Sequence, residues 1–311
     1  MRSAEFGKLA SVYPRVFAQY PTLVVFVASI ALLTPQADAR RADTPCQGRP
    51  PAVGVGAAPT LQPTHEPLTV GSLNMAADAR NAEILESWTR DRSMDVLFLQ
   101  EVGDDGVDGR TLISTVSTRL GFAFAYAPAN VIDGVTEGLA IVSRYSLSDI
   151  RVHPVQYHRL PFRSRCRVAL GATVATPDGP VRLVNVHLDT RINSDSRIAQ
   201  LTPALDVVGT FDGPRIIGGD LNTMNVRWVW GMLPLFYLSR QSDAVRTWMS
   251  SRGFDTPFTD TPPTLRFPIV PMRVDWLYLK DVEPLAWGVD HMEFSDHRGI
   301  WAHVDPKHHP L

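Results

Sequence analysis

The segment RIIGGDLN, residues Arg215–Asn222, contains an apolar run that ends in two polar residues, Asp220 and Asn222. Upstream, the segment VRLVNVH, residues Val181–His187, has the same form, because its apolar run ends in a histidine. Short apolar runs bounded by polar residues predict buried strands. A polar group at the end of a buried strand lies at the edge of a sheet, where several strand ends can converge on one cleft.

The same arrangement recurs along the chain. Further carboxylate, amide or imidazole groups stand at the ends of predicted strands, namely Asn74, Glu101, Glu137, Asp275, Asp296 and His297. Any one of the Asp and Asn residues has a local explanation, because these residues favour turns. Independent turns would not repeatedly select groups that bind metals and carry protons, so we expect the set to form one site.

Nine strands are predicted, at Leu68–Leu73, Val96–Leu99, Phe122–Tyr126, Leu139–Val142, Cys166–Ala175, Val181–His187, Arg215–Gly218, Trp276–Lys280 and Gly299–Val304. Helical spacing predicts helices at Ala79–Thr89, Leu112–Leu120 and Arg197–Thr210. Several connections are too short for the crossover helices that join parallel strands. The pattern therefore favours mixed or antiparallel sheets with helices on their outer faces.

Composition sets outer limits on the function. The 311 residues are 44% hydrophobic and 20% charged, with a net charge of −2, which is typical of one large α/β domain or two small ones. This balance excludes a disordered tail protein, a coiled coil and a strongly basic nucleic-acid coat. Two cysteines, Cys46 and Cys166, are too few for a disulfide scaffold or a zinc ribbon, and the sequence leaves their pairing open.

The first 39 residues have the pattern of a signal peptide. Basic residues precede the apolar run Leu23–Leu33, which is too short to span a membrane, and Ala37–Ala39 fits the small-x-small cleavage pattern. We expect an exported protein, periplasmic or secreted, with an uncleaved N-terminal membrane anchor as the alternative. The Pro- and Gly-rich residues 40–67 are predicted to be a flexible linker, residues 68–305 the folded domain and residues 306–311 a C-terminal tail.

Six motifs occur in an order and at spacings that resemble the endonuclease/exonuclease/phosphatase superfamily of metal-dependent phosphodiesterases. They are Ser72–Asn74, Leu97–Val102, Val184–Leu188, Gly218–Asn222, Val274–Trp276 and Ser295–His297. The resemblance covers about Leu68–Val304. It implies a four-layer α/β/β/α sandwich of two mixed β-sheets flanked by helices, with the site at one edge.

The resemblance also implies a reaction and a cofactor. Phosphodiester hydrolysis needs a cation, an oriented water and a transition-state donor. Mg²⁺, with Mn²⁺ as a substitute, prefers oxygen ligands, for which Glu101, Asn74 and Asp296 are the candidates. Two further residues, Asp275 and His297, are expected to pair. We favour His297 as the base, with Asp220 and Asn222 orienting the water. In the alternative, His297 binds the phosphate and Asp220 is the base.

His187 is similar to a histidine of the deoxyribonuclease-like and sphingomyelinase-like members. In deoxyribonucleases this histidine pairs with a glutamate of an earlier strand, and Glu137 matches that place. The resemblance therefore implies a Glu137–His187 dyad acting as general acid. Arg167 is a candidate phosphate contact, with a solvated strand-edge arginine as the alternative.

Two substrate classes remain open, nucleic acid and phospholipid head groups. The arginine-rich segment Arg159–Arg167 could line a nucleic-acid groove or form a solvated strand face. The aromatic segment Asn225–Leu238 could touch a membrane interface, but we expect a loop and helix buried against the sheet and no long inserted hairpin. An inactive relative that only binds phosphate ligands is the non-enzymatic alternative. We expect a monomer.

Overall fold

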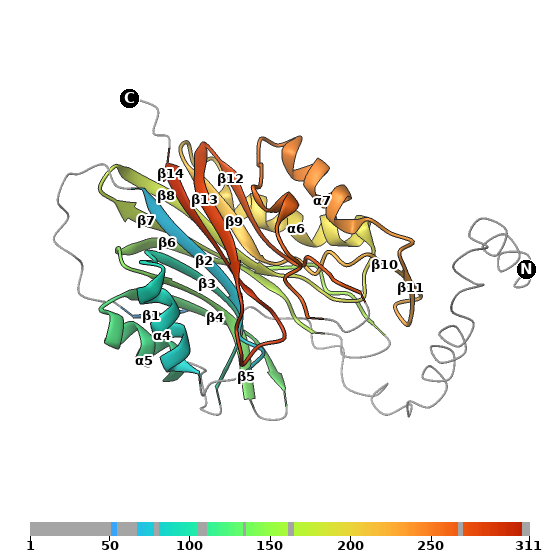
Figure 1. Ribbon diagram of the computed structural model, residues 1–311, viewed down its shortest axis with the longest axis horizontal. Helices are drawn as coiled ribbons and strands as arrows, with labels where there is room; N and C mark the ends of the chain where they lie inside the picture. Colours follow the sequence, from blue (N-terminus) through green and yellow to red (C-terminus); the bar gives the residue numbers. More distant parts are fainter. Residues whose placement is uncertain are drawn as a thin grey trace, which may run out of the picture.

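The computed structural model describes residues 51–54, 67–77, 81–104, 111–132, 135–160, 165–266 and 270–306. Within these residues the chain folds into two large β-sheets packed face to face, with helices on the outer faces (Figure 1). The expected leader, residues 1–39, lies outside the described residues. The helices of the described part are all too short or too polar to cross a membrane.

The first sheet has seven strands in the order β1-β4-β5-β3-β2-β14-β13. In chain order they are β1 (Ala52–Gly54), β2 (Leu68–Asn74), β3 (Val96–Asp104), β4 (Ala123–Ile132), β5 (Val135–Ser143), β13 (Val282–Asp290) and β14 (Gly299–Pro306). Strands β2 and β3 are parallel, and their neighbours pair antiparallel. The sheet is therefore mixed, as the short connections predict.

The second sheet has five strands in the order β12-β9-β8-β7-β6. They are β6 (Leu147–Pro154), β7 (Val168–Thr176), β8 (Gly179–His187), β9 (Arg215–Asp220) and β12 (Asp275–Lys280). A tight hairpin joins β7 to β8, with Thr176 paired to Gly179. Strands β8 and β9 are parallel because helix α6 (Ser194–Val208) crosses between them.

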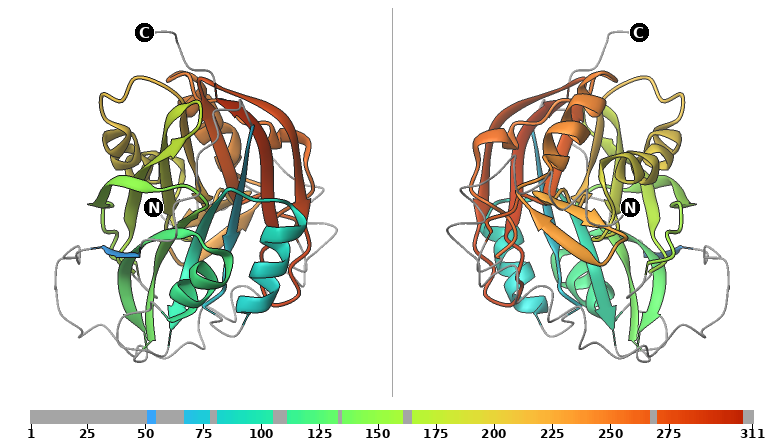
Figure 2. Two further views of the ribbon diagram at one scale, coloured as in Figure 1. Left: turned by 90° about the vertical axis from the view of Figure 1, so that its left-hand side faces the viewer. Right: turned by 90° about the vertical axis from the view of Figure 1, so that its right-hand side faces the viewer.

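Helices lie on the outer face of each sheet (Figure 2). Helices α4 (Ala82–Asp91) and α5 (Thr111–Leu120) pack on the first sheet. Helix α6 packs on the second sheet beside α7 (Gln241–Ser250), and a short 3₁₀ helix lies at Phe258–Asp260. The predicted four-layer α/β/β/α sandwich is confirmed.

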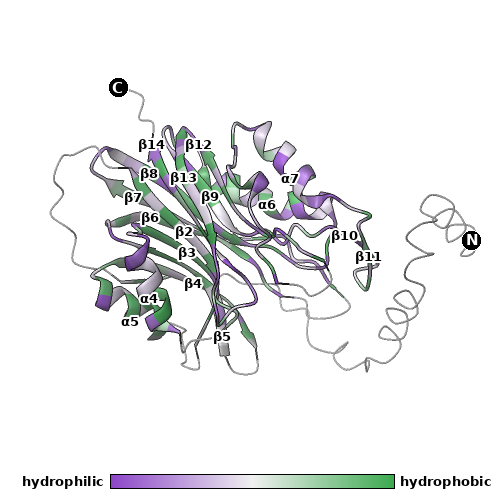
Figure 3. Cartoon of the chain, viewed as in Figure 1, coloured by the Kyte–Doolittle hydropathy of each residue, from purple (hydrophilic) through white to green (hydrophobic). Residues whose placement is uncertain are grey.

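The main hydrophobic core lies between the two sheets and continues under α6. Phe98 of the first sheet and Val184, Ile217 and Leu277 of the second are fully buried in it. Apolar residues line the strands along this interface (Figure 3). A second apolar cluster fills the space under α4 and α5 and includes Leu85. Burial on both faces explains why the predicted strands are near-continuous apolar runs.

Two local departures from regular strand geometry place polar side chains at one edge of the sandwich. The β3–β5 register shifts between Leu99 and Val102, and Glu101, at this bulge, has φ 47°. Asn222, just beyond β9, has φ 51°. Non-glycine residues held at positive φ are costly and concentrate at functional sites. Both residues are candidate site residues.

Several sequence predictions need correction. Glu101 and Glu137 lie inside β3 and β5 rather than beside them. Within the expected linker, Ala52–Gly54 forms strand β1 against β4. The sequence leaves the pairing of the two cysteines open, and Cys166 is disulfide-bonded, whereas Cys46 lies outside the described residues.

The prediction for the aromatic segment Asn225–Leu238 is also wrong. Instead of a loop and a buried helix, the segment forms an antiparallel hairpin of β10 (Val226–Val229) and β11 (Leu233–Phe236). Its inner residues pack on a small apolar cluster with Val270 and Met272. Its tip residue Trp230 is 77% exposed. Successive side chains of a strand point to opposite faces, so only one face of this two-stranded hairpin can be buried. The aromatic side chain at the tip lies outside that face and is exposed.

The backbone at the site leaves no room for a side chain at Gly219. A Cβ there would lie 2.0 Å from the carbonyl oxygen of Val186, and φ is 127°. Gly121 also has positive φ, 72°, but a Cβ there would meet nothing within 4 Å. We predict that Gly219→Ala lowers the free energy of unfolding by at least about 2 kcal/mol more than Gly121→Ala, since only the first adds a backbone clash. Equal losses in urea unfolding would contradict the packing described.

Candidate active site

Three neighbouring strands of the second sheet bring a histidine and two aspartates together. His187 at the end of β8 pairs in register with Asp220 at the end of β9, and Asp220 pairs with Asp275 at the start of β12. All three side chains are buried. The predicted convergence of these strand ends therefore occurs within one sheet.

The first sheet contributes Asn74, which lies at the end of β2. Its Nδ2 donates a 3.0 Å hydrogen bond across the gap between the sheets to Oδ2 of Asp220. Its Oδ1 accepts a 2.9 Å bond from the backbone N–H of Ala76. These two bonds fix the orientation of the amide and join the two sheets at the site.

Asp220 lies at the centre of the cluster. Its Oδ1 accepts a 2.9 Å bond from the backbone N–H of Asn222, and its Oδ2 lies 3.3 Å from His187 Nε2 and 3.8 Å from His297 Nε2. Burial raises the pKa of Asp220, and the negative charge of Asp275 adds to this effect, whereas His297 opposes it. A buried carboxylate with a raised pKa can take up a proton near neutral pH.

His297 and Asp275 form the expected pair. His297 Nδ1 donates to Oδ2 of Asp275 at 2.9 Å, and the backbone N–H of His297 donates to Ser295 Oγ at 3.0 Å. Burial lowers the pKa of His297, but the charges of Asp275 and Asp220 raise it to about 10. The imidazole is therefore protonated at neutral pH, and its Nε2–H lies 3.8 Å from Oδ2 of Asp220.

His187 carries its proton on Nε2. Arg167 Nη1 lies 2.8 Å from His187 Nδ1, and a guanidinium can only donate, so Nδ1 is the acceptor. The Nε2–H group then faces Asp220. Burial, with the charge of Arg167, lowers the pKa of His187 well below its usual range. His187 is a neutral donor in this site.

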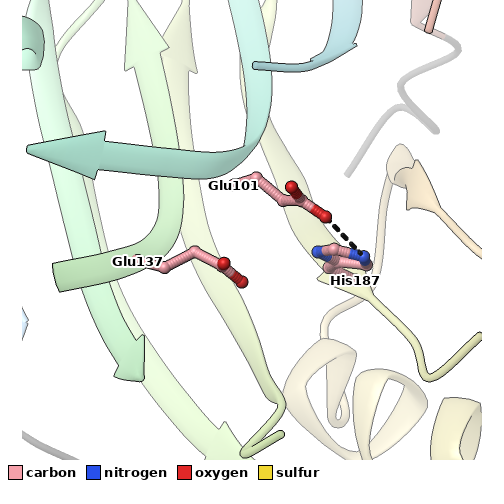
Figure 4. A group of neighbouring side chains, drawn as sticks. All are labelled: Glu101, Glu137 and His187. Carbon is pink, nitrogen blue, oxygen red and sulfur yellow. Dashed lines mark ion pairs between the residues drawn. The ribbon is translucent and has the colours of Figure 1, made fainter. Parts of the chain in front are cut away.

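Glu137 lies near His187 (Figure 4). The hydrogen bonds of both side chains, however, go to arginines. Arg165 Nη1 donates to both carboxylate oxygens of Glu137, at 3.1 and 2.9 Å. The dyad implied by resemblance is thus replaced by an arginine-bridged arrangement. Burial raises the pKa of Glu137, and the charge of Glu101 raises it further.

Arg167 is buried rather than open to a substrate. Besides His187, its guanidinium contacts Asp189 Oδ1 at 3.3 Å. Arg165, two residues earlier, keeps 23% of its side chain exposed and is the more accessible cation. Both arginines therefore face the cluster, and neither forms a solvated strand face.

The residues at the cleft fit a hard divalent cation. Glu101 is partly exposed, and its contacts with Arg165 and His187, at 3.6 and 3.7 Å, are longer than hydrogen bonds, so its lone pairs are available to an ion. The oriented Oδ1 of Asn74 is a neutral oxygen ligand of the kind Mg²⁺ accepts. Asp296 is exposed, and its charge contributes to raising the pKa of His297, which places it at the rim of the site.

Sequence reasoning missed two residues that hold the site in place. Asn185, fully buried on β8, accepts a 2.8 Å bond from Gln100 Nε2 and donates to the carbonyls of Leu99 and Ala140. Arg197, fully buried on α6, donates to the carbonyls of Asp189 and Leu221 at 2.7 Å. In both cases a polar residue stands within an otherwise apolar face of its strand or helix, and this pattern in the sequence could have identified it.

The charge of His297 makes stability depend on pH. Its pKa is raised in the folded chain, so the stabilisation it receives from Asp275 is present at neutral pH and is lost as the pH rises through about 10. We predict that Asp275→Asn lowers the free energy of unfolding by about 3 kcal/mol at pH 7, the scale for breaking a buried ion pair, and by less at pH 10.5. Asp212→Asn, at a fully exposed position, should have no effect at either pH. A loss of the same size for Asp275→Asn at both pH values in urea unfolding would contradict a charged His297.

Comparison with solved structures agrees with this fold. An endonuclease/exonuclease/phosphatase from Beutenbergia cavernae DSM 12333 is 18% identical, with a TM-score of 0.62 over 78% of this chain and 72% of that one. A 3′ phosphatase from Neisseria, bound to a product DNA hairpin, is 17% identical, with a TM-score of 0.56 over 76% and 99%. A mannosyl-6-phosphatase from Bacteroides thetaiotaomicron VPI-5482 is 13% identical, with a TM-score of 0.54 over 76% and 99%. At these identities the likeness shows the fold alone.

A search of curated proteins finds no match. A sequence profile of the endonuclease/exonuclease/phosphatase family matches residues 71–297, which span every candidate site residue from Asn74 to His297. With the sandwich fold and the convergence of the six motifs on one cleft, the chain belongs to the endonuclease/exonuclease/phosphatase family of phosphoesterases.

Proposed function

We propose that this phosphoesterase is a Mg²⁺-dependent phosphodiester hydrolase that acts on nucleic acid. The observation that carries the proposal is the position of Asp220, a buried carboxylate in contact with both imidazoles and bonded to Asn74 of the opposite sheet. A carboxylate held among donors in this way can bind and activate a water beside a phosphate ester.

Glu101 and Asn74 are the residues that would hold the ion, with Asp296 at the rim. A bound divalent ion would neutralise the phosphoryl oxygens as negative charge develops on them. Mn²⁺ is the expected substitute because it accepts the same oxygen ligands.

The remaining residues divide into a base and donors. The raised pKa of Asp220 favours it as the base for the attacking water, and the backbone N–H of Asn222 holds its other oxygen in place. The charged Nε2–H of His297 suits a donor to a phosphoryl oxygen. This supports the alternative assignment, in which Asp220 is the base, over His297 as the base, which the sequence alone favours. His187, as a neutral Nε2–H donor, suits a contact to the leaving side.

The side-chain amide of Asn222 has only one N–H group left to donate to a substrate. One N–H of its amide bonds to the carbonyl of Leu188 at 2.9 Å, which leaves the other available to a phosphoryl oxygen. The completeness of this set argues against an inactive relative that only binds phosphate ligands.

We predict that EDTA abolishes hydrolysis and that Mg²⁺ or Mn²⁺ restores it. The purified chain is assayed on plasmid DNA, RNA, sphingomyelin and phosphatidylinositol phosphates, each with and without the metal. Turnover of plasmid DNA or RNA is expected. Full activity in the chelator, with metal shown absent by elemental analysis, would refute the metal-dependent mechanism.

Substitution tests the assigned residues. We predict that Asp220→Asn, His187→Ala and His297→Ala each lower kcat by at least about 10²-fold, the lower range for a proton-transfer group. Asp212→Asn is the matched control, because Asp212 is fully exposed beyond the opposite end of β9. Retained kcat in all three site variants would rule out this cluster as the catalytic centre.

Phospholipid head groups are the second candidate substrate, and the β10–β11 hairpin favours them. Trp230, Met232 and Tyr237 are 77, 44 and 63% exposed, and the hairpin projects from one end of the sandwich (Figure 1). Residues 221–242 include no acidic residue, whereas Arg227 and Arg240 are exposed. Exposed Trp and Tyr beside arginines suit the interface of an anionic lipid surface.

We predict that replacing Trp230 and Tyr237 together by serine weakens binding to phosphatidylglycerol vesicles by about tenfold or more, the effect of losing about 1.4 kcal/mol. Trp287→Ser is the control, since Trp287 is 44% exposed on β13, a different element. Vesicle sedimentation measures the change. No binding by the wild-type chain, with plasmid DNA hydrolysed, would leave nucleic acid as the substrate.

We further propose that the protein is exported, on the ground of the leader pattern in residues 1–39. N-terminal sequencing of the exported form is expected to begin near Arg40. A retained Met1 would favour the N-terminal membrane anchor instead.

A further inference from the structure

Two arginines occupy one end of the catalytic cleft. Arg165 and Arg167 lie on either side of Cys166, in the segment that leads into β7. Arg165 Nη1 bonds to both oxygens of Glu137 and lies 3.6 Å from Glu101 Oε1. Arg167 Nη1 lies 3.9 Å from Glu137 Oε1 and donates to His187 Nδ1. The two guanidinium groups thus reach every acidic or imidazole group at this end of the cleft.

The same groups would otherwise make a second divalent metal site. Glu101, Glu137 and His187 each offer one ligand atom, and these atoms lie within 4.8 Å of one another (Figure 4). Two carboxylates and an imidazole at this spacing are a common ligand set for a divalent ion. The cluster is distinct from the Glu101–Asn74 position, with which it shares only Glu101.

Arginines already bond to two of the three residues of this cluster, Glu137 and His187. Both oxygens of Glu137 accept from Arg165, and Nδ1 of His187 accepts from Arg167 while Nε2 carries the proton. A metal ligand must present a free lone pair on a deprotonated atom. Glu101 meets this requirement in full, whereas each oxygen of Glu137 already shares a lone pair with Arg165 and His187 has no nitrogen lone pair free.

Charge balance leads to the same conclusion. The carboxylates of Glu101 and Glu137 carry two negative charges, and Arg165 and Arg167 carry two positive charges, of which Arg167 is also shared with Asp189. A further dication would lie within a few ångströms of two guanidinium groups in a largely buried position, where repulsion is only weakly screened.

We propose that Arg165, supported by Arg167, takes the place of a second divalent cation, so that this chain binds a single divalent ion, beside Glu101 and Asn74. This inference deepens the proposed function and rests on it. Arg165 then supplies positive charge to the cleft without a second ion, and removing its side chain opens the Glu101–Glu137 pair to metal.

The test is the number of Mn²⁺ ions bound by the metal-free full chain, counted from the electron paramagnetic resonance signal of free Mn²⁺ during titration. The wild-type chain is expected to bind one. Arg165→Ala is expected to bind two, and the double variant Arg165→Ala, Glu137→Gln is expected to return to one. Arg165→Lys, which keeps the charge, and Arg159→Ala, at an exposed position earlier in the same segment, are expected to bind one.

The outcomes separate the two proposals. Two Mn²⁺ ions on the wild-type chain, or one on a folded Arg165→Ala variant, would overturn the inference about Arg165 and leave the proposed function intact. No Mn²⁺ on the wild-type chain would refute the metal dependence itself. Circular dichroism checks the fold, and Arg165→Gln, which keeps most of the side-chain volume, replaces Arg165→Ala with the same expected count if the alanine variant does not fold.

Discussion

The site depends on hydrogen bonds that buried amide side chains make from one sheet to the other, because these bonds hold the two sheets in register. Asn185 of the second sheet is fully buried, accepts from Gln100 and donates to the carbonyls of Leu99 and Ala140, all three in the first sheet. Asn74 makes the corresponding link to Asp220 one layer nearer the cleft. Apolar contacts alone would let two sheets slide, whereas buried amides lose their partners on any shift, and an unpaired buried amide is costly. The relative placement of groups from opposite sheets follows from these bonds.

Around this frame, burial and charge give chemically different properties to residues of the same kind. His297 is charged because Asp275 and Asp220 lie beside it, whereas burial and the charge of Arg167 keep His187 neutral although Asp220 also lies beside it. Asp220 is buried and takes up a proton more readily than an ordinary aspartate, whereas Glu101 stays partly exposed and available to a cation. Residues with separated proton affinities can act as base and donor at one pH. The division of roles therefore comes from the neighbours of each residue.

Much of this arrangement was predictable from the sequence, because a polar residue at the end of an apolar strand marks the point where the backbone leaves the core. That rule located Asn74, Glu101, His187, Asp220, Asp275 and His297. It could not locate Arg165, because a strand-edge arginine has the same pattern whether it meets solvent or a carboxylate of another strand. It also failed for the β10–β11 hairpin, because aromatic side chains are typical of both a buried element and an exposed tip. These cases depend on contacts between distant parts of the chain.

The central claim is that groups from both sheets form one phosphoesterase cleft with one divalent ion. Anomalous X-ray diffraction from crystals grown with Mn²⁺ and a phosphorothioate dinucleotide tests it most directly. The account predicts a single manganese peak beside Glu101 and Asn74, with the phosphorothioate between the ion and the ring of His297. A manganese peak between Glu137 and His187, or a phosphorothioate bound away from Asp220, would contradict it.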